Sequence, residues 1–407
     1  MKFSYSARNE EGALERGEID LPSERELADY LRNKGLVLTH AESLQAGQTE
    51  HKKMTFKIPG LGGRVSSADK IFFAQNLQVM IKAGLSVAIA LKTQAAQTSS
   101  KAFKEVLEDV YQKVDRGIPL SDAMAGHPKV FSELFVNMVR AGEKSGKLEE
   151  VLRQVSNQLR KSHALVAKVK GALTYPVIVV VAMIGIAIAM MVFVIPKITA
   201  VFQESNVALP LPTRILIGTS DFMINNSLWL LLGTVLFFTL FVRFIHTTYG
   251  KHAWHSLLLK LPVFSSIMRK INLAKFSRTF SSLLKTDIPI VQAFQITATT
   301  LSNVLYRQAI EDAAERVKKG VSISGIIKDY PKLFSPLIIQ MTTVGEETGT
   351  LDSILDELAD FYEEDVDRTM SSLSTIIEPI LMLMLGGGVG GLAVSIILPI
   401  YSLTQSV

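Results

Sequence analysis

The sequence has 407 residues, too many for one ordinary domain, and it combines 43 Lys and Arg with 38 Asp and Glu for a formal net charge of +5. Its mean hydropathy of +0.28 is high although 20% of the residues are charged, so the apolar residues must be concentrated in a few segments. The lack of cysteine excludes disulfides, thiolate metal sites and a cysteine nucleophile.

The first 50 residues are predicted to form a small α/β unit. Short runs of strand-forming residues alternate with turn residues, and one helical segment begins at the N-cap candidate Ser23 and is stopped by Gly35. The expected strand, strand, helix and strand are 3–7, 13–19, 23–34 and 36–38, with a turn at 9–12. Residues 51–66 are rich in Gly, Lys and Thr and have little periodicity, which indicates a linker.

An apolar run at 173–195 has no charged residue and is long enough to cross a bilayer as a helix. A similar run occupies 376–398, and its Pro379 follows Pro176 by 203 positions. At the same offset, GEKSGKL at 142–148 aligns with GEETGTL at 345–351 without a gap. The chain therefore contains a duplication, in which each copy is a module that leads into one membrane span.

Both modules, 67–171 and 270–375, are predicted to be helical bundles because their apolar residues recur at helical spacing. The first helix of each module carries such a stripe: Phe73, Leu77, Met80 and Ile81 in the first, and Phe276, Phe280, Leu283 and Leu284 in the second. The last helix of each module meets no proline before Pro176 or Pro379, so it is expected to continue into its span. The two spans are predicted at 172–195 and 376–400, and the two prolines are predicted to kink the helices where they enter the membrane.

A third span is predicted at 227–245. From Arg243 to Lys275 the chain has six Lys and Arg and no Asp or Glu, whereas the loop at 196–226 balances its charges. Basic segments next to spans are retained in the cytoplasm. The connection at 246–269 and both modules are therefore predicted to be cytoplasmic and the loop at 196–226 periplasmic, with the N-terminus inside and the C-terminus outside.

Two helical modules with the pattern G-E-x-[ST]-G-x-L, each followed by a span with Pro near its start and at its end, resemble the type II secretion F family. The stretches KVKGALTYP at 168–176 and YSARN at 5–9 are similar to this family as well. The family includes the inner-membrane platform proteins of type IV pili and type II secretion systems. The second copy departs from the first at Glu378, where the first has Tyr175.

This resemblance implies a non-enzymatic scaffold without a cofactor. Such a scaffold couples hexameric cytoplasmic assembly ATPases to the insertion or extraction of pilin or pseudopilin subunits. Other inner-membrane assembly proteins are further implied partners, and nucleic acid is not one.

The GEKSGK sequence is faintly similar to a phosphate-binding loop. However, Gly142 and Gly146 are one residue too close for that motif, and the second copy has Thr350 where Lys147 stands. We expect a turn between helices, with glycines at its corners, and the alternative is a partner contact made by the glutamates. The residues concerned are Gly142, Glu143 and Gly146 in the first module and Gly345, Glu346 and Gly349 in the second.

The last span offers two further candidates. Glu378 lies at the mouth of the span and is expected either to reach interfacial water or to contact a pilin or a neighbouring helix. Overlapping G-x-x-x-G pairs, which allow helix backbones to approach closely, are formed by Gly386, Gly387, Gly388, Gly390 and Gly391. These glycines could pack against another span of the same chain, make an oligomer contact or dock the apolar helix of a pilin.

The two copies differ in charge, because residues 143–165 sum to plus two and residues 346–368 sum to minus nine. Our hypothesis is that the acidic face with Asp352, Asp356 and Asp360 meets a basic surface, either the first module of a neighbouring subunit or an ATPase. Solvated helix faces and a bound divalent cation are the alternatives. The pair His252 and His255 has no third ligand nearby and is expected on an interfacial helix.

The sequence thus predicts an all-α integral membrane protein with two duplicated cytoplasmic helical-bundle modules, three transmembrane helices and a small N-terminal α/β unit. Its predicted function is that of a platform of a pilus or secretion machine, in contact with membrane lipid and assembled as a homo-oligomer. A small membrane transporter or channel subunit is the alternative, which the few polar groups within the spans disfavour.

Overall fold

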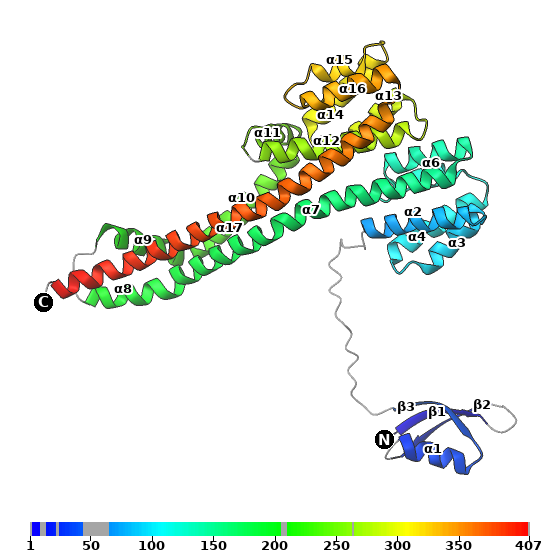
Figure 1. Ribbon diagram of the computed structural model, residues 1–407. Coiled ribbons are helices and arrows are strands. Elements are labelled where there is room, and N and C mark those ends of the chain that lie inside the picture. Colours follow the sequence, from blue (N-terminus) through cyan, green and yellow to red (C-terminus); the bar gives the residue numbers. More distant parts are fainter. Residues whose placement is uncertain are drawn as a thin grey trace. The chain divides into compact units, whose positions relative to one another are not determined.

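The computed structural model describes residues 2–8, 14–21, 24–43, 65–204, 210–262 and 264–405, which form two units, Met1–Arg64 and Val65–Val407 (Figure 1). The first unit is an antiparallel sheet of three strands in the order β2-β1-β3, with one helix. Its elements are β1 (Lys2–Arg8), β2 (Leu14–Asp20), α1 (Glu24–Asn33) and β3 (Val37–Ser43). The third strand is longer than the predicted 36–38, and the predicted turn at 9–12 lies outside the described residues, as does most of the predicted linker.

The second unit begins with the first helical module. A capping box starts it, because the Ser66 side chain accepts a bond from the Asp69 N–H while the Asp69 carboxylate accepts one from the Ser66 N–H, each at 3.1 Å. Its helices are α2 (Ser67–Lys82), α3 (Val87–Gln97), α4 (Lys101–Asp115), α5 (Leu120–Ala125), α6 (Glu133–Ser145) and the first part of α7 (Leu148–Ala189). Phe73 and Leu77 are buried, as the apolar stripe predicts.

The second module repeats these elements in the same order, which confirms the duplication. Its helices are α12 (Phe264–Leu284), α13 (Ile290–Thr300), α14 (Val304–Val317), α15 (Ile323–Lys328), α16 (Pro336–Thr348) and the first part of α17 (Leu351–Gln405). The turn after the first helix needs a residue with positive φ in both copies. This residue is Gly84 (φ 85°) in the first module and Asp287 (φ 59°) in the second, because Asp tolerates the left-handed region better than most residues.

Equivalent aromatic side chains fill the two modules. The rings of Phe103 and Phe131 are 6.4 Å apart in the first module, and those of their counterparts Tyr306 and Phe334 are 5.7 Å apart in the second. The buried apolar residues of both modules belong to one continuous cluster. The modules are therefore packed together as one body.

Three helices of the described residues are long and apolar enough to cross a membrane: Leu148–Ala200, Ser227–His246 and Leu351–Ile397. As predicted, the last helix of each module continues into its span, and Figure 1 shows α7 and α17 side by side. A π-helical turn (Met190–Val194) and α8 (Ile195–Glu204) follow α7. The kinks at Pro176 and Pro379 stay a prediction, and both prolines lie within continuous helices.

The segment at 196–226, predicted to be a loop, contains α8 and a further helix, α9 (Leu211–Asn225). Pro210 and Pro212 suit a helix start, and two hydroxyls then fix α9 against the spans. Ser220 donates to the carbonyl of Met191 at 2.5 Å, and Thr213 donates to the carbonyl of Ser395 at 2.6 Å. The remaining helices are α10 (Ser227–His246), which is the third span, and α11 (Thr248–Leu258).

Candidate functional site at the contact between the modules

The G-E-x-[ST]-G corner of the first module is a structural joint. Gly142 lies where α6 crosses α7, and a Cβ on it would come within 2.9 Å of the Val151 side chain. Gly146 ends α6 in the left-handed conformation with φ 70°. The carboxylate of Glu143 accepts bonds from the backbone N–H groups of Leu120 at 2.5 Å and Ser121 at 2.9 Å, and so caps the start of α5.

The second module repeats this joint. A Cβ on Gly345 would lie 3.0 Å from the Cα of Leu351, and Gly349 has φ 71°. Glu346 accepts bonds from the N–H groups of Ile323 at 2.6 Å and Ser324 at 3.1 Å. The glycines thus occupy helix corners, and both glutamates, which we considered for a partner contact, find their partners inside their own modules.

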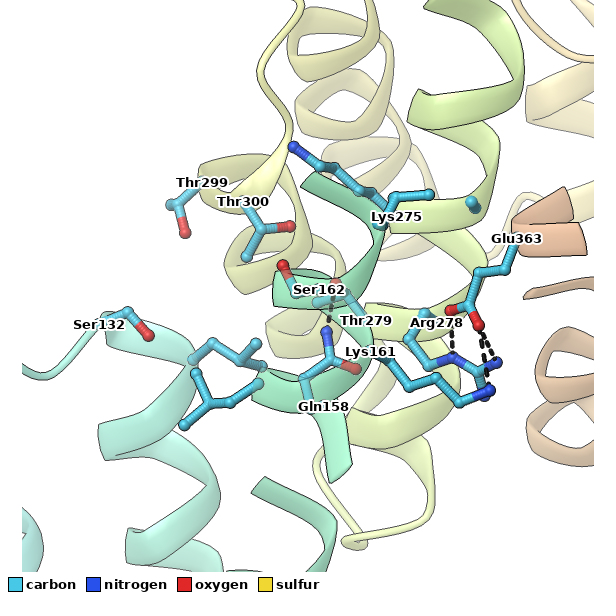
Figure 2. A pocket seen from close by; sticks show the side chains of 14 residues that line it. Ser132, Gln158, Lys161, Ser162, Lys275, Arg278, Thr279, Thr299, Thr300 and Glu363 are labelled. Atoms are coloured by element: carbon cyan, nitrogen blue, oxygen red, sulfur yellow. Dashed lines mark hydrogen bonds and ion pairs between the residues drawn. The ribbon is translucent and has the colours of Figure 1, made fainter. Parts of the chain in front are cut away.

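Carboxylates of the acidic face of α17 pair with an arginine of α12, and Figure 2 shows one of them, Glu363, against Arg278. The side chain of Arg278 is only 11% exposed and pairs with Asp356, Asp360 and Glu363, the last at 2.8 Å. Burial disfavours the charge of Arg278, but the bond to Glu363 and the charges of Asp360 and Asp356 outweigh it and raise the pKa of Arg278. One cation and three carboxylates leave an excess of negative charge at this point.

Lys161 of α7 in the first module supplies a second cation. Its ammonium lies 2.9 Å from Asp360 and 3.2 Å from Glu363. The bond to Asp360 raises the pKa of Lys161 although burial opposes it. We call Lys161, Arg278, Asp356, Asp360 and Glu363 the charge cluster, and it joins α7 of the first module to α12 and α17 of the second.

A glutamine extends the same contact. The Gln158 side chain donates to the hydroxyl of Thr279 at 3.1 Å and accepts from the hydroxyl of Ser282 at 3.1 Å. Figure 2 shows Gln158 and Lys161 directed from α7 towards α12. A cavity of about 260 Å³ lies beside them, lined by residues of both modules that include Ser132, Leu165 and Lys275.

The hypothesis for the acidic face therefore needs a correction. We expected its basic partner on a neighbouring subunit or an ATPase, but Asp356 and Asp360 meet Arg278, Lys285 and Lys161 of the same chain. Asp352 is not part of the charge cluster, although its backbone carbonyl accepts a bond from Ser281 at 2.8 Å. Among the described residues, no cluster of three potential metal ligands was found at this face or elsewhere.

The intramembrane candidates lie apart from this contact. Glu378 and Pro379 are exposed on α17, and Pro176 is buried on α7. A Cβ placed on any of Gly386, Gly387, Gly388, Gly390 and Gly391 would meet open space. Among the described residues these glycines therefore do not pack against another span of the same chain, and an oligomer contact or the docking of a pilin helix stay predictions.

His255 lies on α11 as expected for this basic connection. Its Nδ1 accepts the N–H of Val304 at 3.1 Å, which ties α11 to the second module. Burial is the main cause that lowers the pKa of His255, and Lys251 adds to it. The imidazole therefore serves as a neutral acceptor in a packing contact.

Sequence reasoning missed Arg278, Lys161 and Gln158. The available signal was a set of aligned differences, since the offset of 203 places Gln75 at the position of Arg278. The same offset matches the three carboxylates of the charge cluster with Arg153, Asn157 and Arg160. Arg278 stands where the first module has a neutral glutamine, and its neighbours on α17 are acidic where the first module has basic or neutral residues. These opposite changes indicate an ion pair, which the net charge of each segment does not reveal.

Taken together, these features define a multi-pass membrane protein built on a duplicated helical module. The family described as "Type II secretion system (T2SS), protein F" matches residues 73–196 and 276–399, which are the two modules with their spans. The description "Type II secretion system protein F, N-terminal domain" matches residues 1–42. The chain belongs to the type II secretion system protein F family, as its sequence pattern predicts.

Relatives come from both kinds of machine. The chain is 35% identical over 401 residues to the type IV pilus assembly protein PilC of Thermus thermophilus, with 98% of each chain covered. It is 32% identical over 409 residues to the protein of the same name of Myxococcus xanthus, covering 100% of this chain and 96% of that one. It is also 32% identical over 388 residues to the type II secretion system protein F of Aeromonas hydrophila, covering 95% and 98%.

Proposed function

We propose that this chain is the inner-membrane platform of a type IV pilus or type II secretion machine. In this role it couples hexameric assembly ATPases in the cytoplasm to the insertion or extraction of a pilin or pseudopilin, and it performs no chemistry itself. The names of its relatives, which refer to type IV pilus assembly and to type II secretion, support this role. Other inner-membrane assembly proteins and further copies of the chain complete the proposed set of partners.

The observation that carries the proposal is the continuity of α7 and α17. Each begins at the corner of a module and continues through a proline into an apolar, charge-poor segment. At 1.5 Å per residue, the 55 residues of α17 extend for about 80 Å. A displacement of either module is therefore transmitted along a helix to the part of the span within the membrane.

The charge cluster supports the same role. Because Lys161 and Arg278 join α7, α12 and α17, a force on one module reaches the other module and both long helices. A partner that turned one module would tilt two spans together. Such a joint suits a protein that converts ATPase motion into movement of a pilin within the bilayer.

The proposed orientation follows the distribution of basic residues. The modules and α11 face the cytoplasm, and the segment with α8 and α9 lies in the periplasm. Alkaline phosphatase fused after Gln405 should be active in living bacteria, and the same enzyme fused after Lys260 should be inactive. The reverse pattern would invert the topology and remove the modules from the reach of any ATPase.

A reconstituted system tests the coupling. The purified chain in lipid nanodiscs is mixed with the assembly ATPase of its own machine, and ATP turnover is measured with and without the chain. We expect turnover to change with the intact chain and to change less with Arg278→Met, while the matched variant Gln75→Met behaves as the unaltered chain. Unchanged turnover, together with normal pilus assembly and secretion in a deletion strain, would exclude the platform role.

A further inference from the structure

The two modules meet through unlike surfaces. The first module contributes the surface of α6 and α7, which we call its long-helix face, with Asn137, Gln158 and Lys161. The second module contributes the surface of α12 and α13 with the flanking carboxylates of α17, which we call its first-helix face. Since the modules are copies of one fold, the second module also has a long-helix face and the first module also has a first-helix face.

The long-helix face of the second module is uncovered in the isolated chain. Phe361 stands where the first module has Gln158, and it is 46% exposed whereas Gln158 is 6% exposed. Leu337 is likewise exposed, and its counterpart Leu134 is buried. An open groove of about 460 Å³ runs beside Phe361, at the place where the first module holds the cavity of Figure 2.

The first-helix face of the first module is uncovered as well. Val79 is 59% exposed, whereas its counterpart Ser282 is 6% exposed because Gln158 covers it. Phe72 is 67% exposed on the same side of α2, and Ile89 of α3 is exposed where the second module has Gln292 in contact with Asn137. Large apolar side chains in such a row on a water-facing module are typical of an interface.

The charges of the two uncovered faces are complementary, with signs opposite to those of the contact within the chain. Within the chain Lys161 meets Asp360 and Glu363. The counterpart of Lys161 is Glu364, and the counterparts of the two carboxylates are Asn157 and Arg160. Glu364 has a surface pair with Arg368 at 2.9 Å, and Arg160 makes no ion pair among the described residues.

We propose that a second copy of this chain covers these faces by repeating the internal contact, so that the long-helix face of one chain's second module packs on the first-helix face of the next chain's first module. In this contact Phe361 lies against Val79 and Phe72, and Glu364 lies against Arg160. The proposal specifies the contact between copies in the homo-oligomer of the proposed function. It rests on the proposed function only for the expectation that copies of the chain meet.

The kind of contact also fixes the kind of assembly. Two unlike faces make a head-to-tail interface, which generates a ring or an open row and not a closed pair with a twofold axis. Each module leads into a membrane span, so successive copies stand side by side in the bilayer. One end of an open row leaves a long-helix face free and the other end leaves a first-helix face free, so a further copy can be added at either end.

Cysteine cross-linking tests the contact directly, because the chain has no cysteine of its own. The Gln158 Oε1 and the Ser282 Oγ are 3.1 Å apart, so cysteines at these two positions lie within the span of a short bis-methanethiosulfonate cross-linker, and Gln158→Cys with Ser282→Cys in one chain serves as the positive control. The corresponding pair between chains is Phe361→Cys and Val79→Cys. Two differently tagged full-length chains, each with one of these substitutions, are expressed together and treated with the same cross-linker in isolated membranes.

We expect a cross-linked dimer that contains both tags, in several-fold excess over dimers of either single variant. Absence of the mixed dimer while the Gln158→Cys and Ser282→Cys control closes would overturn the proposal. Equally efficient dimers of the Val79→Cys chain alone would overturn it too, since they require a twofold contact.

Charge exchange provides an independent test. Arg160→Glu or Glu364→Arg alone should lower the yield of the mixed dimer several-fold, and combining them should restore it. Glu311→Arg on α14, outside both faces, is the matched control and should leave the yield unchanged. A yield that Arg160→Glu and Glu364→Arg both leave unchanged contradicts the contact. If ATP turnover still responds to the chain in that case, the platform role stands without the contact.

Discussion

The two modules share a fold and a corner but use their outer surfaces differently. Both have a glycine at the helix crossing and a glutamate that caps a short helix. On α12, however, Arg278 replaces Gln75 of α2, and the neighbouring carboxylates replace basic or neutral residues. The duplicated core thus fixes the shape of a module, and the charges on its outer helices decide which face meets which partner.

Opposite signs are what allow the copies to pack on each other. If the second module had Arg, Asn and Arg at the positions of its three carboxylates, as the first module has at 153, 157 and 160, Lys161 would lie against like charges. The inverted signs favour one pairing of the modules and disfavour the others. Substitutions that make one module resemble the other therefore test this difference.

The largest effect is expected from Arg278→Met. The change leaves Asp356, Asp360 and Glu363 with Lys161 and Lys285 as the remaining cations. Removing one partner of a buried ion pair costs about 3–5 kcal/mol, and the partial exposure of Asp356 and Asp360 reduces this to about 2–4 kcal/mol of unfolding free energy. Thermal unfolding of the detergent-solubilised chain measures the loss.

Gln75→Met at the equivalent position of the first module is the matched control and should cost little. Adding Asp356→Asn, Asp360→Asn and Glu363→Gln to Arg278→Met should restore much of the stability, because the carboxylates are then neutral. If this quadruple variant is no more stable than Arg278→Met alone, unpaired carboxylates are not the cause of the destabilisation by Arg278→Met.

Much of the fold could be predicted from local patterns. The stripe with Phe73 and Leu77, the glycine corners and the continuation of each module into its span depend on helical periodicity and on the positions of Pro176 and Pro379. Such features repeat at a fixed offset, so each copy supports the interpretation of the other. The helices at 196–226 were missed because α9 buries the hydroxyl residues Thr213 and Ser220 and leaves apolar residues such as Ile215 exposed, so no apolar stripe marks it in the sequence.

The candidate site was predictable only in part. Its acidic half stood out as a run of carboxylates, but the choice of partner depends on which helices lie together in space. Arg278 is 82 residues from Asp360, and Lys161 is 199 residues from it. No local pattern relates positions so far apart. For this reason the basic partner of the acidic face was expected on another protein and not within the same chain.

The second prediction concerns the helix crossing. Gly142→Ala should destabilise the chain by about 1–3 kcal/mol, because its Cβ would overlap the Val151 side chain at 2.9 Å and approach the Cα of Leu148 at 3.2 Å. Gly345→Ala should cost a similar amount, since its nearest contact is backbone. Gly386→Ala meets open space and serves as the control in the same unfolding measurement. Equal behaviour of all three variants would refute the close-approach explanation.

The third prediction separates the cap from a partner contact. Glu143→Ala leaves the N–H groups of Leu120 and Ser121 without their acceptor, so we expect a loss of about 1–2 kcal/mol. Glu143→Gln retains one acceptor and should cost less. Hydrogen exchange at α5 should accelerate in both variants and not at α15, which Glu346 caps. Unaltered exchange at α5 with weakened ATPase binding would instead favour a partner contact.

The smallest effect is a pH dependence within the charge cluster. Burial raises the pKa of Asp360, but its bonds with Lys161 and Arg278 outweigh burial and leave the pKa below the ordinary value. A carboxyl with a lowered folded-state pKa stabilises the chain above about pH 4, its unfolded value, and loses that contribution as the pH falls through the folded-state pKa. Because Asp360 is largely exposed, we expect about 0.5 kcal/mol or less.

Asp360→Asn isolates this contribution and gives α17 the residue that α7 already has at Asn157. The variant should be less stable than the unaltered chain at pH 6, and the two should converge towards pH 3, in paired unfolding measurements that cancel the titration of all other groups. A stability difference between the Asp360→Asn variant and the unaltered chain that stays constant from pH 6 to pH 3 would mean that the contact of Asp360 is steric and not ionic.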